Sequence, residues 1–163
     1  MRHSLALLSI PALLTVVVTG CGASAKPPPS ASQADRMKAV VRTWNANLNA
    51  QNNALQPRLF SYPAVISLMA GPYGCYCLTP AAVMHFHTQL LCSVKILSIT
   101  VRGHYATAVF GHFGNRQFSP SKCLEPPGAR TGMRFTIVRG KITVLKQLWW
   151  KPPGRAVIRA PGR

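Results

Sequence analysis

The chain has 163 residues, of which 48% are hydrophobic, and its 19 Lys and Arg residues against two carboxylates give a formal net charge of +17. This length fits one folded domain with flanking segments, and the apolar fraction is sufficient for a packed core. Because Asp35 and Glu125 are the only carboxylates in the sequence, catalysis by paired carboxylates is nearly excluded. The excess of cations has two interpretations: attraction to a polyanion such as anionic lipid or an envelope polymer, or a basic surface without a specific partner.

Residues 1–20 have the pattern of a secretory signal peptide that is removed. A basic start at Arg2 is followed by an apolar run over residues 5–18, and small residues come next. A membrane-spanning helix needs about 20 apolar residues, whereas this run is shorter and contains Pro11. We therefore expect export across the membrane without a permanent transmembrane anchor.

The end of the apolar run offers two processing sites. The stretch Val18-Thr19-Gly20-Cys21 resembles the lipobox of bacterial lipoproteins, in which the cysteine becomes the lipidated, palmitate-bearing first residue. The resemblance implies a protein held by Cys21 at the extracytoplasmic face of the cell membrane, with residues 21–34 as a Pro- and Ser-rich linker. The alternative is ordinary cleavage after Ala23-Ser24-Ala25, which would release a secreted protein.

Lipidation of Cys21 would leave an even set of cysteines for disulfides, namely Cys75, Cys77, Cys92 and Cys123. Zinc is the alternative, but the C-x-C spacing does not match the paired C-x-x-C of a structural zinc site. A helix over residues 80–90 would be about 16 Å long, which keeps Cys77 away from Cys92. Cys123 then pairs with Cys92 or with an earlier cysteine, and Cys92 is our first choice. That choice leaves Cys75 and Cys77 joined to each other, free, or paired between molecules.

A long amphipathic helix is predicted from Asp35 to just before Pro57. Ser32 and Asp35 form a capping-box pattern at its start, with Asp in place of Glu or Gln. Apolar residues recur at helical spacing along one side: Met37, Val40, Val41, Trp44, Leu48 and Leu55. Asparagines fill the other side, which we interpret as a solvated face. Residues 57–78 have apolar content without a clear period.

A second helix is predicted after Thr79-Pro80, which supplies an N-cap and a proline at the first helical position. At 100° per residue, His87 lies among the apolar side chains and His85 points to the opposite side. Two histidines on opposite sides of a helix cannot bind one metal ion together, so no metal site is expected. His87 is either a core histidine with a satisfied hydrogen bond or a polar group that lines a pocket.

Two antiparallel hairpins are predicted in the second half of the chain. The first joins 93–101 to 104–113 through Arg102-Gly103, and the second joins 133–138 to 141–150 through Arg139-Gly140. A two-residue loop in the second hairpin places Ile137 opposite Ile142 and Phe135 opposite Val144. Residues 151–163 combine prolines with regularly spaced cations and are predicted to form a flexible basic tail.

This order of elements resembles the NTF2-like superfamily, which includes SnoaL-like proteins, over residues 35–150. The resemblance is carried by Trp44 in the first helix, by "TPAAVMHFHTQL", by "SITVRGHYATAVF" and by "RFTIVRGKITVLKQLWW". It implies an α+β cone in which helices pack inside a curved antiparallel sheet. Members use the interior of the cone as a ligand pocket, an enzyme site or a packed core, and Trp44, His87 and Tyr105 are the pocket candidates here.

A non-enzymatic function is expected for this domain. Ketosteroid isomerase and polyketide cyclase types of the superfamily place acidic or histidine acid/base groups inside the cone, and this chain is poor in carboxylates. A histidine-dependent enzyme using His87, His104 or His112 is an alternative that lacks the usual orienting carboxylate. We expect a lipid-anchored domain that binds a small ligand or an envelope protein, with no cofactor and no nucleic acid. The alternative is binding of envelope polyanions or anionic lipid by charge.

Overall fold

The computed structural model of the chain describes residues 31–68, 74–90, 92–115, 123, 126–154 and 157–159. All of them belong to one compact unit, Ala31–Arg163. The predicted signal peptide, Cys21, the first ten residues of the linker and Glu125 lie outside the described residues. No helix in the described ranges is long and apolar enough to cross a bilayer.

Helix α1 spans Gln33–Asn49 and begins as the sequence predicts. The Ser32 hydroxyl accepts a hydrogen bond from the backbone N–H of Asp35 and donates one to its carboxylate, at 3.1 and 2.7 Å, which satisfies the helix start. The predicted end before Pro57 is wrong, because the chain leaves the helix at Asn49 and Gln51 takes a positive φ of 55°. A 3₁₀ turn, η1, follows at Gln56–Leu59.

The asparagine side of α1 is not simply solvated, as the sequence had suggested. Asn47 is buried. The Asn49 side-chain amide donates to the Val94 carbonyl at 2.8 Å and accepts from the Val94 N–H at 3.0 Å. This pair of bonds ties the end of α1 to the sheet at a β-bulge, where backbone groups need side-chain partners.

The described residues form seven strands in one sheet, in the order β2-β1-β6-β5-β4-β3, with β7 paired to β6. Their bounds are β1 Phe60–Ser67, β2 Gly74–Cys77, β3 Cys92–Arg102, β4 Tyr105–Asn115, β5 Arg130–Val138, β6 Lys141–Lys151 and β7 Ile158–Arg159. Helix α2, Pro80–Thr88, connects β2 to β3 and is capped by Thr79 as predicted. The expected antiparallel pairing holds for the other strand pairs, but the sheet is mixed, because β1, which had no clear sequence signal, pairs with β6 in parallel.

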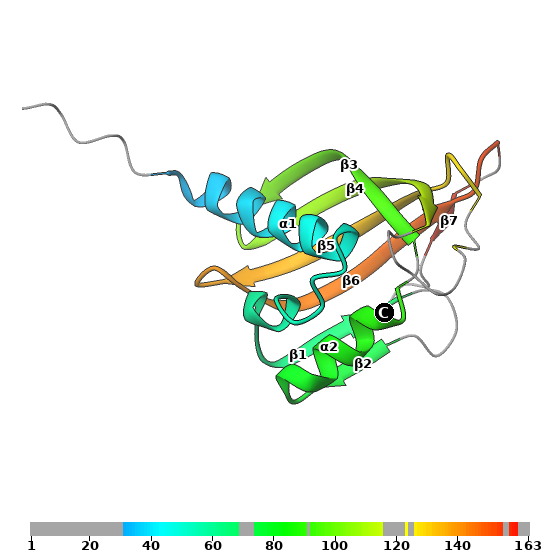
Figure 1. Ribbon diagram of the computed structural model, residues 1–163. Coiled ribbons are helices and arrows are strands. Elements are labelled where there is room, and N and C mark those ends of the chain that lie inside the picture. The colour runs from blue at the N-terminus through cyan, green and yellow to red at the C-terminus, as the bar shows by residue number, and fades with distance from the viewer. Residues whose placement is uncertain are drawn as a thin grey trace, which may run out of the picture. The chain divides into compact units, whose positions relative to one another are not determined.

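The helices lie on one face of the sheet, which we call the inner face (Figure 1). Helix α1 packs against β3 and β4, and α2 packs against η1 and β2. The core fills this inner face and draws side chains from α1, α2, β1 and the long strands β3 to β6. The opposite face, the outer face, carries the alternate residues of each strand.

The β3–β4 hairpin has the predicted strands but a loop displaced by one residue. Arg102 pairs with Tyr105, so the loop is Gly103–His104 and not Arg102-Gly103. Gly103 takes a φ of 56°, which a glycine adopts without steric cost. The glycine therefore occupies the first loop position.

The β5–β6 hairpin closes through Arg139-Gly140 as predicted, with φ of 50° and 75°, the positive values of a type I′ turn. Ile137 lies opposite Ile142 as expected. The predicted pairing of Phe135 with Val144 is wrong, because a bulge next to the turn places Leu145 opposite Phe135. Both of these side chains are fully buried on the inner face, so the bulge brings Leu145 into the core.

Both disulfides of the structure use the predicted cysteines. Cys92 is bonded to Cys123 with the Cα atoms 4.7 Å apart, which confirms our first choice. Cys75 is bonded to Cys77, the first of the three arrangements left open for this pair. Disulfides persist in oxidising compartments, so the two bonds suggest an extracytoplasmic location.

Candidate functional site

The interior of the cone holds a cluster of aromatic side chains centred on Trp44 of α1, which is 1% exposed. Its ring centroid lies 5.8 Å from that of Phe110 on β4 and 5.3 Å from that of Phe135 on β5. His87 of α2 lies 5.9 Å away and also contacts Phe60 and Phe86. Side chains of α2, β4 and β5, which are far from α1 in the sequence, therefore meet around the Trp44 indole.

His87 uses both ring nitrogens in this cluster and has no exposed surface. The Trp44 Nε1–H donates to His87 Nε2 at 2.9 Å. The His87 Nδ1 lies 2.8 Å from the Val83 carbonyl one helical turn earlier. Because Nε2 accepts and a carbonyl can only accept, the network assigns the proton of the neutral imidazole to Nδ1.

The third pocket candidate, Tyr105, lies outside this cluster. It is 39% exposed on the outer face, where the Arg134 guanidinium lies 5.4 Å from its ring centroid. His104, in the adjacent turn, packs against the same ring at 4.0 Å. The structure thus brings Trp44 and His87 together and places Tyr105 elsewhere.

His112, the last of the named histidines, lies on β4, two residues after the buried Phe110 and on the same face. Both of its ring nitrogens are buried and without a hydrogen-bond partner. This burial lowers the pKa of His112 from its ordinary value of 6.5, because desolvation disfavours the charged imidazole. A neutral imidazole can accept a proton, but the described residues give it no group that would orient the ring.

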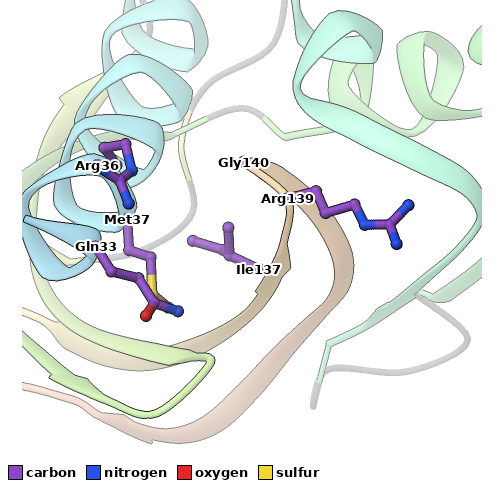
Figure 2. A pocket seen from close by; sticks show the side chains of 6 residues that line it. All are labelled: Gln33, Arg36, Met37, Ile137, Arg139 and Gly140. Carbon is purple, nitrogen blue, oxygen red and sulfur yellow. The ribbon is translucent and has the colours of Figure 1, made fainter.

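A pocket of about 330 Å³ opens at the start of α1, beside the β5–β6 turn and away from the Trp44 cluster (Figure 2). It is lined by Gln33, Arg36, Met37, Ile137, Arg139 and Gly140. Figure 2 shows Met37 and Ile137 pointing toward one another, whereas the Arg139 side chain is directed away. The Arg36 guanidinium donates to the Ala31 carbonyl, which holds it at the edge of the pocket.

Sequence reasoning missed this pocket, although both of its walls were predicted. The capping box predicted the start of α1, and Arg139-Gly140 predicted the turn. No sequence signal placed the two side by side. The described residues contain no group of three or more His, Cys, Asp or Glu side chains that could hold a metal ion.

No protein-family model and no curated protein matches the chain. Solved structures do resemble it. A candidate ketosteroid isomerase from Kribbella flavida is 13% identical and superposes with a TM-score of 0.54, covering 78% of this chain and 84% of that one. A candidate polyketide cyclase from Sinorhizobium meliloti is 17% identical with a TM-score of 0.52, covering 71% of this chain and 99% of that one.

A third structure, an NTF2-like protein of unknown function from Burkholderia xenovorans, is 11% identical with a TM-score of 0.53. It covers 78% of this chain and 88% of its own. Identities this low speak for the fold and not for an activity. The chain therefore has the NTF2-like α+β fold, as its element order had suggested.

Proposed function

We propose that this chain is a non-enzymatic NTF2-like domain that is held by lipid on Cys21 at the extracytoplasmic face of the cell membrane and binds a small ligand or a protein partner there. The proposal of a non-enzymatic function rests on the hydrogen bonding of His87. His87 is a titratable side chain at the centre of the cone, and its two nitrogens are already engaged by Trp44 and Val83. The other inward-facing histidine, His112, has no hydrogen-bond partner among the described residues that would orient its ring.

Proton transfer requires a base that can reach the substrate. In this cone the rings of Trp44, Phe60 and Phe86 pack around His87, and all three side chains are buried. Asp35, the one carboxylate among the described residues, is exposed in the first turn of α1, where it accepts a hydrogen bond from Ser32 and pairs with Lys38. The arrangement supports an interior that is a packed core.

The pocket beside the start of α1 supports ligand binding outside this core. Its volume, about 330 Å³, lies at the lower end of the range for small-molecule sites. Met37 and Ile137 provide an apolar wall, and Arg36 provides a cation at the edge. This chemistry fits a small amphipathic anion.

Thermal unfolding with octanoate and with octylamine tests this pocket, because the two probes share an apolar tail and differ in charge. We expect octanoate to raise the melting temperature saturably and octylamine to have no effect. Arg36→Gln should abolish the octanoate shift, and Arg42→Gln, which removes an exposed cation from the same helix, should retain it. If Arg36→Gln and Arg42→Gln behave alike, the pocket is not the binding site.

The anchor has a separate test. Protein extracted from the membrane fraction of the expressing bacterium is analysed by intact mass with and without reductant. Lipidation predicts a chain that starts at Cys21 with added acyl mass, and Cys21→Ser should move the protein out of the membrane fraction. A mature start after Ala25 without acyl mass would favour secretion instead.

A further inference from the structure

The outer face of β5 and β6 carries two pairs of cations that lie directly opposite each other. Arg134 pairs with Lys146, and Arg130 pairs with Lys151. These residues alternate along β5 with the buried Thr131, Met133 and Phe135, which places them on the face away from the helices. Like charges directly opposite each other destabilise a sheet.

Nothing in the described fold compensates this repulsion. Asp35 is the one carboxylate among the described residues, and it is on α1, where it pairs with Lys38. The Arg134 guanidinium contacts the ring of Tyr105, but this contact does not neutralise its positive charge. Two unfavourable pairs on adjacent strands are therefore better explained by an anionic partner than by folding.

An indole lies between the two pairs. Trp149 is opposite Gly132, and a Cβ added to Gly132 would come within 2.3 Å of Trp149 Nε1. The ring therefore lies flat on the sheet over the glycine, in a position that any side chain at 132 would displace. Strand β7 adds a further exposed cation beside it, because Arg159 pairs with Trp149.

These residues form a linear surface that we call the basic stripe: Arg134 and Lys146, then Trp149 with Arg159, then Arg130 and Lys151. The two cation pairs are four residues apart along β5, which is about 13 Å at roughly 3.3 Å per residue. A single small anion cannot contact both pairs. A linear ligand with repeated negative charges can.

We propose that the basic stripe binds an anionic polysaccharide, with a sugar ring packed on Trp149 and carboxylate or phosphate groups on the flanking Lys and Arg residues. The flat indole offers a plane to the C–H face of a sugar ring. The two disulfides fit an oxidising compartment, which favours an extracytoplasmic polysaccharide over an intracellular nucleic acid as the occupant. A second copy of the chain is excluded as occupant, because two equally basic faces repel each other. This surface is separate from the pocket at α1 and does not depend on it.

Binding of the unit Ala31–Arg163, which contains the described core and both disulfides, to polygalacturonate tests the proposal. Uncharged dextran, single-stranded DNA and phosphatidylglycerol vesicles are the comparison probes. We expect saturable binding to polygalacturonate that weakens as salt screens the charges, and weaker binding to the other three.

Two variants and a matched control locate the site. Arg134→Gln with Lys146→Gln should weaken binding about tenfold or more, and Trp149→Ala about fivefold. Arg42→Gln with Lys38→Gln removes the same charge from α1 and should leave binding within about twofold of the wild-type value. Equal losses in both double variants would show that net charge alone acts and would overturn the proposal. The proposal would also be overturned if the protein bound DNA or vesicles more tightly than polygalacturonate and Trp149→Ala left that binding unchanged.

Loss of folding cannot imitate this result, because Lys146→Gln relieves a like-charge pair. The melting temperature of that variant should equal or exceed that of the wild type while its polygalacturonate binding falls. If Lys146→Gln binds polygalacturonate less and also has a lower melting temperature than the wild type, the weaker binding reflects unfolding. That result would contradict the proposal.

Discussion

The hydrogen bond between Trp44 and His87 should stabilise the fold rather than serve catalysis. In His87→Leu the Trp44 Nε1–H stays buried without its acceptor, because Trp44 is 1% exposed. An unpaired buried donor costs about 1–3 kcal/mol. For a domain of this size that loss lowers the melting temperature by roughly 4 °C per kcal/mol.

A double-mutant cycle isolates this bond from the packing around it. Trp44→Phe alone should cost about 1–3 kcal/mol, because the smaller ring leaves space beside Phe110 and Phe135. In the double variant no indole N–H remains unpaired, so the total loss should fall short of the sum by about 1–2 kcal/mol.

Urea unfolding under oxidising conditions, with a common slope for all four proteins, measures these free energies. Additivity within about 0.3–0.5 kcal/mol would mean that the bond contributes nothing and that the assignment of the His87 proton to Nδ1 is wrong. A His87→Leu variant more stable than the wild type would contradict a core role outright, since residues kept at a cost in stability are typical of functional sites.

Three further outcomes follow from the described contacts. Replacing Cys92 and Cys123 by Ala opens a crosslink with a sequence separation of 31 and should cost about 3–4 kcal/mol by the chain-entropy estimate, measured by urea unfolding against the wild type. Asn49→Ala removes both hydrogen bonds to Val94 and should cost about 1–3 kcal/mol, with faster amide exchange at the start of β3; unchanged exchange would refute the link. The pKa of His112 is lowered from 6.5 by burial, so the unfolded chain binds more protons as pH falls below that value and stability should decline on acidification. His112→Phe should flatten this decline between about pH 7 and about pH 5, and an unchanged slope would assign the effect to other groups.

Local signals were sufficient for the helix starts and for most of the long strands. Ser32 with Asp35 and Thr79 with Pro80 place side-chain oxygens and a proline where a helix needs them, and these interactions lie within one turn of chain. The turn at Arg139-Gly140 was also readable, because its glycine permits the positive φ that a short hairpin loop requires.

The end of α1 and the strand β1 were not readable. The apolar spacing of the helix continues to Leu55, but that side chain is 40% exposed and the chain has already left the helix. Asn49 ends the helix through bonds to Val94, a residue far along the sequence. Strand β1 had no clear period, and its place is set by parallel pairing with β6.

For the candidate sites too, the sequence predicted local features and not contacts between distant residues. The positions of His87 and His85 on opposite sides of α2 follow from helical periodicity, and His87 is buried as that geometry indicated. The partner of His87 could not be known, because Trp44 reaches it only when α1 lies across the sheet.

The basic stripe shows the limit most clearly. Its cations come from different strands, and Arg134 lies opposite Lys146 because of the hairpin turn and the bulge next to it. The sequence by itself determined the chain's charge, its expected export signal and the two helix starts, and it made Cys123 the first choice of partner for Cys92. Only the tertiary structure decided which cations meet on one face, because strand register is fixed by burial of the opposite face and not by the charges themselves.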